Sequence, residues 1–341
     1  MSSADAAPDT AHPPRKTPRK NWDIVVLVVM VVALVSAGTY FNTNIFTAGR
    51  ICNGWITPDG VADAFGGGLG RVSVTSESSR GCWIKRTSWL SSGEDEIETM
   101  NLRVESTSEH SPFREPEWEI SADQHVMTGG VQGSFSEDGG GTLLPESCTR
   151  IALGEQPQAM LQIDVNTEDE ADVAAIGRLL ESATKAITSG PHGCTAPDFS
   201  TTPTTHHFSP SAVTEPDFAN VCGVAGFKLA PPTTEIRQQV LEQTSGSFNE
   251  DWYCDVSVKG PDDNYPADDV VLQMGIVTDR RLVKRLGNAG FAHANCGGEE
   301  TVFPVTVRHL PEQDRMQMGL PTTAHLSAAF SQAARHALHC T

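Results

Sequence analysis

The longest uninterrupted run of apolar residues lies near the N-terminus. Residues 24–41 read IVVLVVMVVALVSAGTYF and contain no charged residue. As an α-helix this run would be about 27 Å long, close to the ~30 Å thickness of the hydrocarbon core of a bilayer. We therefore expect a transmembrane helix over residues 24–41.

Beyond this run, short segments alternate between apolar and polar residues, as half-buried β-strands do. The alternation predicts strands near residues 71–76, 82–88, 97–106, 148–153, 159–165, 254–259, 269–277, 301–309 and 314–319. Residues 168–188 and 326–337 carry apolar residues three and four positions apart, which predicts amphipathic helices. Thr167 and Glu170 form a capping box before the first of these helices.

Two shorter helices are expected to open the two sets of strands. Thr57-Pro58-Asp59 is typical of an N-cap and first turn, and residues 234–243 carry apolar side chains on one helical face. Strands joined by short polar turns favour antiparallel sheets. The expected fold class is α+β: two duplicated domains, each an antiparallel sheet with an opening helix and a closing amphipathic helix.

The cysteine spacing suggests the duplication. The eight cysteines are separated by 30, 66 and 46 positions in the first half and by 32, 42 and 44 in the second. RGCWIKRTSW, residues 80–89, also resembles NEDWYCDVSV, residues 249–258. Four cysteines allow three pairings in each unit. We favour the pairing that pins each opening and closing segment to its sheet: Cys52–Cys82, Cys148–Cys194, Cys222–Cys254 and Cys296–Cys340.

These patterns divide the chain into consecutive segments. We expect a disordered cytoplasmic tail, a transmembrane helix, a short stalk, a first α+β domain, a linker rich in Thr, Pro and Ser, and a second α+β domain. Their bounds are 1–23, 24–41, 42–50, 51–195, 196–216 and 217–341.

The order of Cys52, an opening helix, Cys82-Trp83, a sheet and the helix 168–188 resembles exported modules of actinobacterial membrane-anchored proteins and lipoproteins. Some of those modules are similar to the PsbP/Mog1 α/β sandwich. The second unit departs from the pattern, because Trp252-Tyr253 precedes its cysteine. The resemblance implies binding or sensing in the cell envelope and implies no reaction.

Charge and cysteine content indicate the compartment and exclude one class of partner. The formal net charge is −19, which disfavours nucleic acid and anionic lipid surfaces as partners. An even number of cysteines indicates disulfides and an oxidising environment. Basic residues precede the apolar run, so its N-terminal side should remain cytoplasmic: Arg15, Lys16, Arg19 and Lys20. The alternative is a signal peptide cleaved after Ala37, which would release a secreted protein.

Several short motifs invite a chemical interpretation, but each has a simpler structural one. Ser182 to Lys185 fits S-x-x-K without the accompanying catalytic motifs, and residues 66–70 are a glycine-rich turn without a phosphate-binding context. His336 and His339 lack further ligands nearby, and the acidic residues of the 262–269 loop lack EF-hand spacing. We therefore expect no catalytic residue, cofactor or metal site.

Residues 107–146 form a long insertion in the first unit. A connection of this length is either functional or disordered. We favour a mobile surface loop, with a ligand-binding lid as the alternative; its candidate contacts are Arg114, Trp118 and His125. The leading expectation is a non-catalytic, membrane-anchored envelope protein that binds a protein or small ligand through a sheet face or the crevice between units. The alternatives are an exported enzyme with a dispersed active site and a structural or assembly component.

Overall fold

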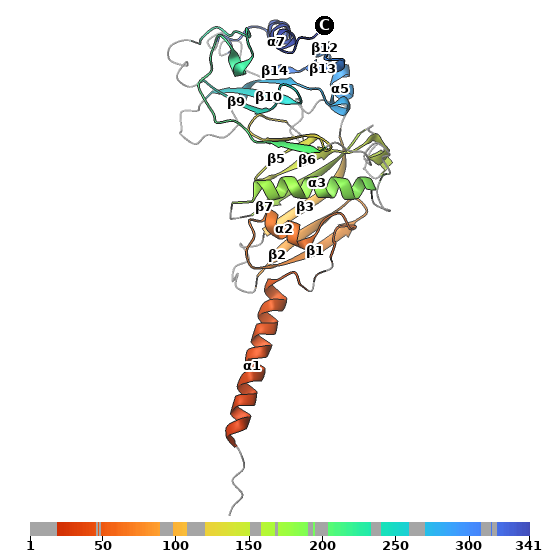
Figure 1. Ribbon diagram of the computed structural model, residues 1–341, viewed down its shortest axis with the longest axis vertical. Coiled ribbons are helices and arrows are strands. Elements are labelled where there is room, and N and C mark those ends of the chain that lie inside the picture. The colour runs from red at the N-terminus through yellow and green to blue at the C-terminus, as the bar shows by residue number, and fades with distance from the viewer. Residues whose placement is uncertain are drawn as a thin grey trace, which may run out of the picture.

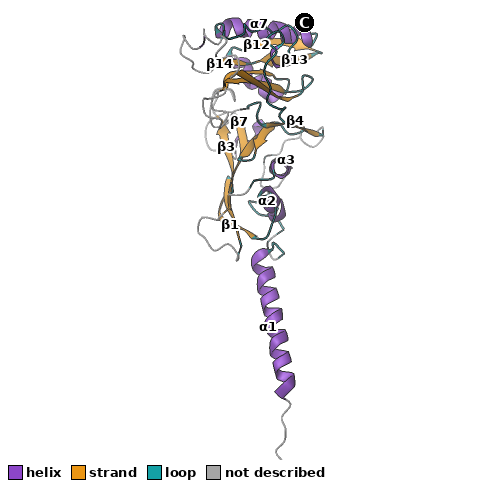
Figure 2. Cartoon of the chain, turned by 90° about the vertical axis from the view of Figure 1, so that its left-hand side faces the viewer, coloured by secondary structure: helices purple, strands orange, loops and turns teal. Residues whose placement is uncertain are grey.

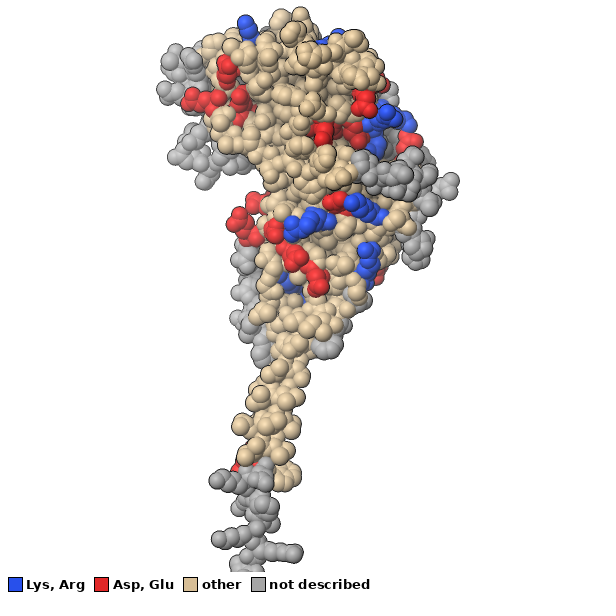
Figure 3. Space-filling model, viewed as in Figure 1, with Lys and Arg blue, Asp and Glu red and all other residues tan. Residues whose placement is uncertain are grey.

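The computed structural model describes residues 19–45, 47, 49–88, 98–107, 120–150, 158–167, 170–189, 194, 204–232, 240–258, 270–307, 315 and 319–341. The protein is α+β, with antiparallel sheets and an N-terminal apolar helix, α1 (Arg19–Asn42) (Figure 1). Within the described part, Trp22–Tyr40 is the one stretch that is long and apolar enough to cross a membrane. Its side chains are exposed over residues 22–36, and Figure 3 shows α1 free of charged residues above its lower end.

The end of α1 is fixed to the folded part rather than joined to it by a free stalk. The Asn42 carbonyl accepts a hydrogen bond from the Gly70 amide at 3.1 Å, and Asn44 Oδ1 accepts one from the Val72 amide at 2.9 Å. Arg71 lies over the Tyr40 ring. The first strand therefore starts directly above the apolar helix.

We call residues 51–195 unit 1 and residues 217–341 unit 2. The sheet of unit 1 has eight strands in the order β1-β2-β3-β7-β6-β5-β4-β8, and all their pairings are antiparallel. The strands are β1 (Arg71–Ser78), β2 (Gly81–Thr87), β3 (Glu98–Thr107), β4 (His125–Gly129), β5 (Gly133–Ser136), β6 (Gly139–Leu143), β7 (Gln158–Asn166) and β8 (Thr205–Phe208).

Two helices, α2 (Pro58–Ala64) and α3 (Val173–Ser189), lie on one side of this sheet (Figure 2). The Thr57 hydroxyl caps α2 by accepting from the Gly60 amide, as the sequence predicted. The capping box predicted for α3 is wrong. Thr167 instead donates to Glu98 at 3.1 Å, and the Asp172 carboxylate accepts from the Ala175 amide at 3.0 Å.

The described part of the 107–146 insertion is not a loose surface loop. Residues 125–143 form β4, β5 and β6, which extend the main sheet. The predicted linker also contributes structure, since β8 pairs with β4 at the sheet edge. The Ser211 amide donates to the Thr244 carbonyl at 2.7 Å, so the segment after β8 is also bonded to unit 2.

Unit 2 contains a four-stranded antiparallel sheet, β14-β11-β10-β9, and a hairpin of β12 and β13. Its strands are β9 (Val240–Gly246), β10 (Trp252–Val258), β11 (Val270–Ile276), β12 (Ala292–Cys296), β13 (Glu299–Phe303) and β14 (Val305–Val307). The short helices are η3 (Val221–Gly223), α5 (Arg280–Leu286) and η5 (Gly287–Ala289). The closing helix α7 (Thr323–Ala337) buries Leu326 and Phe330 in a core with Trp252 and Phe303.

Four disulfides join Cys52 to Cys82, Cys148 to Cys194, Cys222 to Cys254 and Cys296 to Cys340. These are the pairs favoured from the sequence. In each unit the first bond attaches the opening turn to a strand, β2 or β10. The second attaches the segment that follows or ends the closing helix to the region before the last strand of the sheet.

Three predicted elements are wrong where the structure describes them. Cys148 lies in a 3-10 helix, η1 (Glu146–Arg150), instead of a strand. Residues 240–243, expected to be helical, begin strand β9. The strand predicted over 301–309 is interrupted at Pro304, which has no amide hydrogen for the ladder and separates β13 from β14. The strand predicted at 314–319 and the acidic loop at 262–269 lie almost entirely outside the described residues.

Candidate functional site

The two units meet across a shared apolar core that fills the crevice predicted between them. Unit 2 packs against the end of the unit 1 sheet at β4, β6 and β7, on the face opposite α2 and α3. Unit 1 contributes Ile120, Ala122, Val126, Leu143 and Met160, and unit 2 contributes Tyr253, Val277, Leu282, Val283, Leu286, Phe291 and Val302. Because these side chains from both units are buried in one continuous cluster, the crevice between units is a packed junction rather than a ligand cleft.

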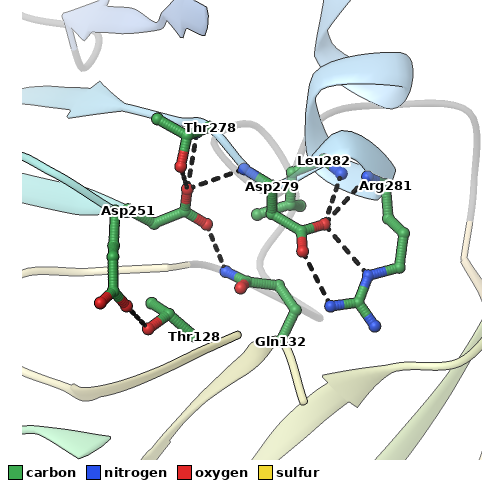
Figure 4. Close-up of polar contacts among 8 residues, drawn as sticks. Thr128, Gln132, Asp251, Thr278, Asp279, Arg281 and Leu282 are labelled. Atoms are coloured by element: carbon green, nitrogen blue, oxygen red, sulfur yellow. Dashed lines mark hydrogen bonds and ion pairs between the residues drawn. The ribbon is translucent and has the colours of Figure 1, made fainter. Parts of the chain in front are cut away.

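A buried carboxylate, Asp251, lies at the polar edge of this junction (Figure 4). It comes immediately before β10 and is 1% exposed. Its Oδ1 accepts hydrogen bonds from the amides of Thr278 at 2.7 Å and Asp279 at 3.0 Å. Its Oδ2 accepts one at 2.5 Å from Nε2 of Gln132, a unit 1 side chain. Asp251 therefore bonds both units at once.

Burial, and to a smaller extent the nearby Asp279 carboxylate, raise the pKa of Asp251 to about 6 despite the hydrogen bonds from the Thr278 and Asp279 amides, which lower it. Desolvation dominates, because an ionised carboxylate in this environment loses water that three or four hydrogen bonds only partly replace. Burial and the same two carboxylates also hold the pKa of Tyr253 well above its usual value, so its phenol remains neutral.

Asp279 has its own partners in unit 2. Its Oδ1 accepts from the amides of Arg281 at 2.9 Å and Leu282 at 3.4 Å and so caps α5. Its Oδ2 pairs with the Arg281 guanidinium at 2.8 Å. The cap places the N-terminus of α5, and with it the apolar side chains of that helix, against unit 1.

Further polar contacts cross the junction on either side of Asp251. Asp255 accepts from the Ser121 hydroxyl and from the Ala122 amide, the latter at 2.8 Å. The Thr128 hydroxyl donates to Glu250, and the Ser245 hydroxyl donates to the Gln124 carbonyl at 2.8 Å. With the apolar core, these contacts hold the units as one packed body.

Of the three candidate contacts of the predicted ligand loop, the structure describes only His125. His125 is part of β4, where it faces α3 and stacks on Phe135 with ring centroids 5.1 Å apart. Burial lowers the pKa of His125, and His207 lowers it further. This histidine is a neutral packing residue of the sheet. Arg114 and Trp118 lie outside the described residues.

The remaining surface of interest is the part of the unit 1 sheet that neither helices nor unit 2 cover. In β2, Cys82 and Ile84 face the helices, so Trp83 faces the opposite side, where it is 45% exposed. The register places Trp83 beside Asn101, Asn101 beside Asp164, and Asp164 beside Gly139. We call the side chains of β2, β3 and β7 on this side the open face: Trp83, Lys85, Thr99, Asn101, Arg103, Glu105, Gln162 and Asp164.

The open face ends where unit 2 begins. Glu105 pairs with Met160, and Met160 pairs with Leu143; both Met160 and Leu143 are buried in the junction core. Two residues further from unit 2, Arg103 pairs with Gln162 across β3 and β7. Two residues further again, Asn101 lies between Trp83 and Asp164. The exposed residues of β2, β3 and β7 therefore form a surface that is bounded at one end by unit 2.

Trp83 was noted in the sequence only as the neighbour of Cys82. The alternation of residues 81–87 already places it on the face opposite Ile84, which is the signal that identifies this surface. No group of three or more His, Cys, Asp or Glu residues suited to a metal ion occurs in the described part of the chain.

Comparison of the chain with protein-family models, with curated proteins and with solved structures finds no match. The resemblance to PsbP/Mog1 modules, drawn from short motifs, thus remains an expectation. The geometry of the open face and of the junction is what supports a functional proposal.

Proposed function

We propose that the protein is a single-pass membrane protein that binds or senses an envelope component outside the cell, without catalysing a reaction. Helix α1 is the anchor, its N-terminal side is cytoplasmic, and units 1 and 2 lie outside. The exposed apolar surface of α1 supports the anchor, and four disulfides support an oxidising environment for both units.

One observation supports binding above the others: an exposed tryptophan lies on a sheet face that no other described helix or strand covers. Helices α2 and α3 cover one side of the unit 1 sheet, and unit 2 covers part of the other. Trp83 remains 45% exposed among polar side chains. Tryptophan is enriched in binding surfaces because it offers a large apolar area together with a hydrogen-bond donor.

We also propose that units 1 and 2 descend from one duplicated module. Cys52 and Cys222 both adopt a left-handed backbone, with φ of 54° and 58°, before disulfides to β2 and β10. The sheets share the order of a hairpin, a third strand and a later fourth strand beside the third: β1-β2-β3-β7 and β9-β10-β11-β14. A helix, α3 or α7, follows each fourth strand.

Photo-crosslinking from the open face in native membranes tests the binding proposal. A crosslinking residue is placed at position 83 or 101, and a matched control is placed at position 69, where Leu69 is 64% exposed outside the open face. The proposal predicts the same adduct from positions 83 and 101 and none from 69. Equal labelling from all three positions, or none from any, would refute the open face as the binding surface.

A further inference from the structure

The polar side chains beside Trp83 hold one another in fixed positions. Arg103 pairs through Nε with Glu105 at 2.6 Å and through Nη1 with Asp164 at 2.8 Å. Gln162 Nε2 donates to the other oxygen of Asp164 at 3.0 Å. Asn101 lies between Trp83 and Asp164 in the register. Hydrogen-bonding groups on the adjacent strands β3 and β7 are thus already oriented before any ligand arrives.

The charges of the open face cancel. Lys85 and Arg103 are balanced by Glu105 and Asp164, and Arg103 contacts both carboxylates directly. A strongly charged ligand would have to break these pairs without meeting a surplus of opposite charge. A purely apolar ligand would strip water from the carboxylates and the guanidinium with no replacement. The face suits a ligand that is uncharged and rich in hydrogen-bonding groups.

The shape of the face also restricts the ligand. Gly81 of β2 pairs with Arg103, and Gly139 of β6 pairs with Asp164 in the row that also contains Trp83. A Cβ on Gly139 would lie 2.0 Å from the Ile163 carbonyl oxygen, so these positions stay without side chains. Strands about 4.8 Å apart then give a flat surface about 10 Å wide from Trp83 across Asn101 to Asp164.

We infer that the open face binds a neutral saccharide of the cell envelope, an inference that rests on the proposed function. The indole ring of Trp83 stacks on the C–H face of a sugar ring, whose slightly positive hydrogens meet the negative face of the aromatic system. Asn101, Gln162, Asp164 and Arg103 donate to and accept from the ring hydroxyls, which are both donors and acceptors. Unit 2 borders the open face at one end and so limits how far a bound saccharide can extend in that direction.

The inference is tested by calorimetric titration of the full chain in lipid nanodiscs with neutral di- and oligosaccharides of hexoses and pentoses. Uronic-acid oligosaccharides and a pool of uncharged peptides serve as comparison probes. The inference predicts saturable binding of at least one neutral saccharide, about tenfold weaker in Trp83→Ala and largely restored in Trp83→Phe. Asn101→Ala weakens the same saccharide, and the matched control Leu69→Ala binds as wild type does.

Two results overturn the inference and have different meanings. If no neutral saccharide binds but a peptide or uronic-acid probe binds in a Trp83-dependent manner, the ligand class is wrong and the proposed function stands. If saccharides bind equally well to wild type, Trp83→Ala and Asn101→Ala, the open face is not the site. An unchanged melting temperature and the absence of thiols that can be alkylated confirm that each variant is folded with its disulfides formed, so loss of binding is not loss of structure.

Discussion

Gln132 of unit 1 donates a hydrogen bond of 2.5 Å from Nε2 to Oδ2 of Asp251 of unit 2, across the buried junction. The other amide atom, Gln132 Oε1, is buried and has no hydrogen-bond partner among the described residues. The pair is therefore arranged so that a proton on Asp251 could be donated to Gln132 Oε1 after the amide turns over. This relationship connects the protonation of one side chain to the association of the two units.

Stability should fall as pH rises through the titration of Asp251. The folded-state pKa is raised from 3.8 to about 6, so the folded state binds the proton more tightly than the unfolded state does. The stabilisation from the protonated Asp251 carboxyl is fully present below pH 3.8 and is lost as pH rises through about 6. The difference is about 3 kcal/mol in the free energy of unfolding. Denaturant titrations of the full chain in nanodiscs between pH 4 and pH 7 measure this slope.

Asp251→Asn is the matched neutral variant for this prediction. Its oxygen still accepts from the Thr278 and Asp279 amides, and its NH₂ can donate to Gln132 Oε1, so the fold is retained and the slope between pH 4 and 6 largely disappears. Asp251→Ala leaves both amides without an acceptor and should be about 2–4 kcal/mol less stable than Asp251→Asn at every pH. An unchanged pH slope in Asp251→Asn would show that another group controls it.

Besides β10 and β11, which are largely apolar, the sequence correctly predicted four strands of unit 1 in which apolar and polar residues alternate: β1, β2, β3 and β7. Each buries one face under α2 and α3, so local pattern and tertiary packing agree. The disulfide pairing favoured from the sequence is also confirmed: it joins the opening and the closing segment of each unit to the strand region nearest in sequence.

Strands β4, β5 and β6 could not be read from the sequence because they are short and rich in glycine. A Cβ on Gly133 would lie 2.1 Å from the Gly141 carbonyl oxygen, so the residue that reads as a strand breaker is required by close strand approach. The helix predicted over residues 240–243 is wrong for another reason. Their apolar spacing fits a helix, but pairing with β10 makes them a strand.

Of the two features of the candidate site, one could be predicted from the sequence and the other could not. Alternation in β2 places Trp83 opposite Ile84, so exposure of that tryptophan follows from the sequence. The burial of Asp251 does not, because it depends on unit 2 packing against β4 and on Gln132, 119 residues earlier in the chain. Contacts between units carry no local sequence pattern.

The packing of α3 on the inserted strands gives a second prediction. A Cβ on Gly177 would lie 2.5 Å from Cζ of Phe135, and Phe135 is held in place by stacking with His125. Gly177→Ala should therefore lower the free energy of unfolding by about 1–3 kcal/mol, although alanine favours helices. Phe135→Leu makes room, so adding Gly177→Ala to that variant should cost little; equal costs in both backgrounds would contradict the packing.

The Cys148–Cys194 disulfide gives a third prediction. It closes a loop of 46 residues and ties the segment after α3 to η1, before β7. Replacing both cysteines with alanine should cost about 2–5 kcal/mol in the free energy of unfolding, measured by denaturant titration with the other three disulfides intact. A double variant as stable as wild type would show that the Cys148–Cys194 disulfide does not stabilise the packing of α3 and β7.

The fate of the N-terminal helix gives a fourth prediction. The anchor requires that the mature protein keep residues 1–37, and intact-mass measurement of protein purified from membranes reads this directly. The proposal predicts the mass of the full chain in the membrane fraction. A mature chain that begins at Gly38 and is found in the medium would establish a cleaved signal peptide instead.

The most direct test of the central claim is hydrogen exchange of the full chain in nanodiscs, with and without a solubilised extract of the cell envelope. If the open face is the binding surface, the extract slows exchange in β2, β3 and β7 of wild type, and the effect is lost in Trp83→Ala. Protection confined to the outer surfaces of α3 or α7, or no protection at all, would contradict the account.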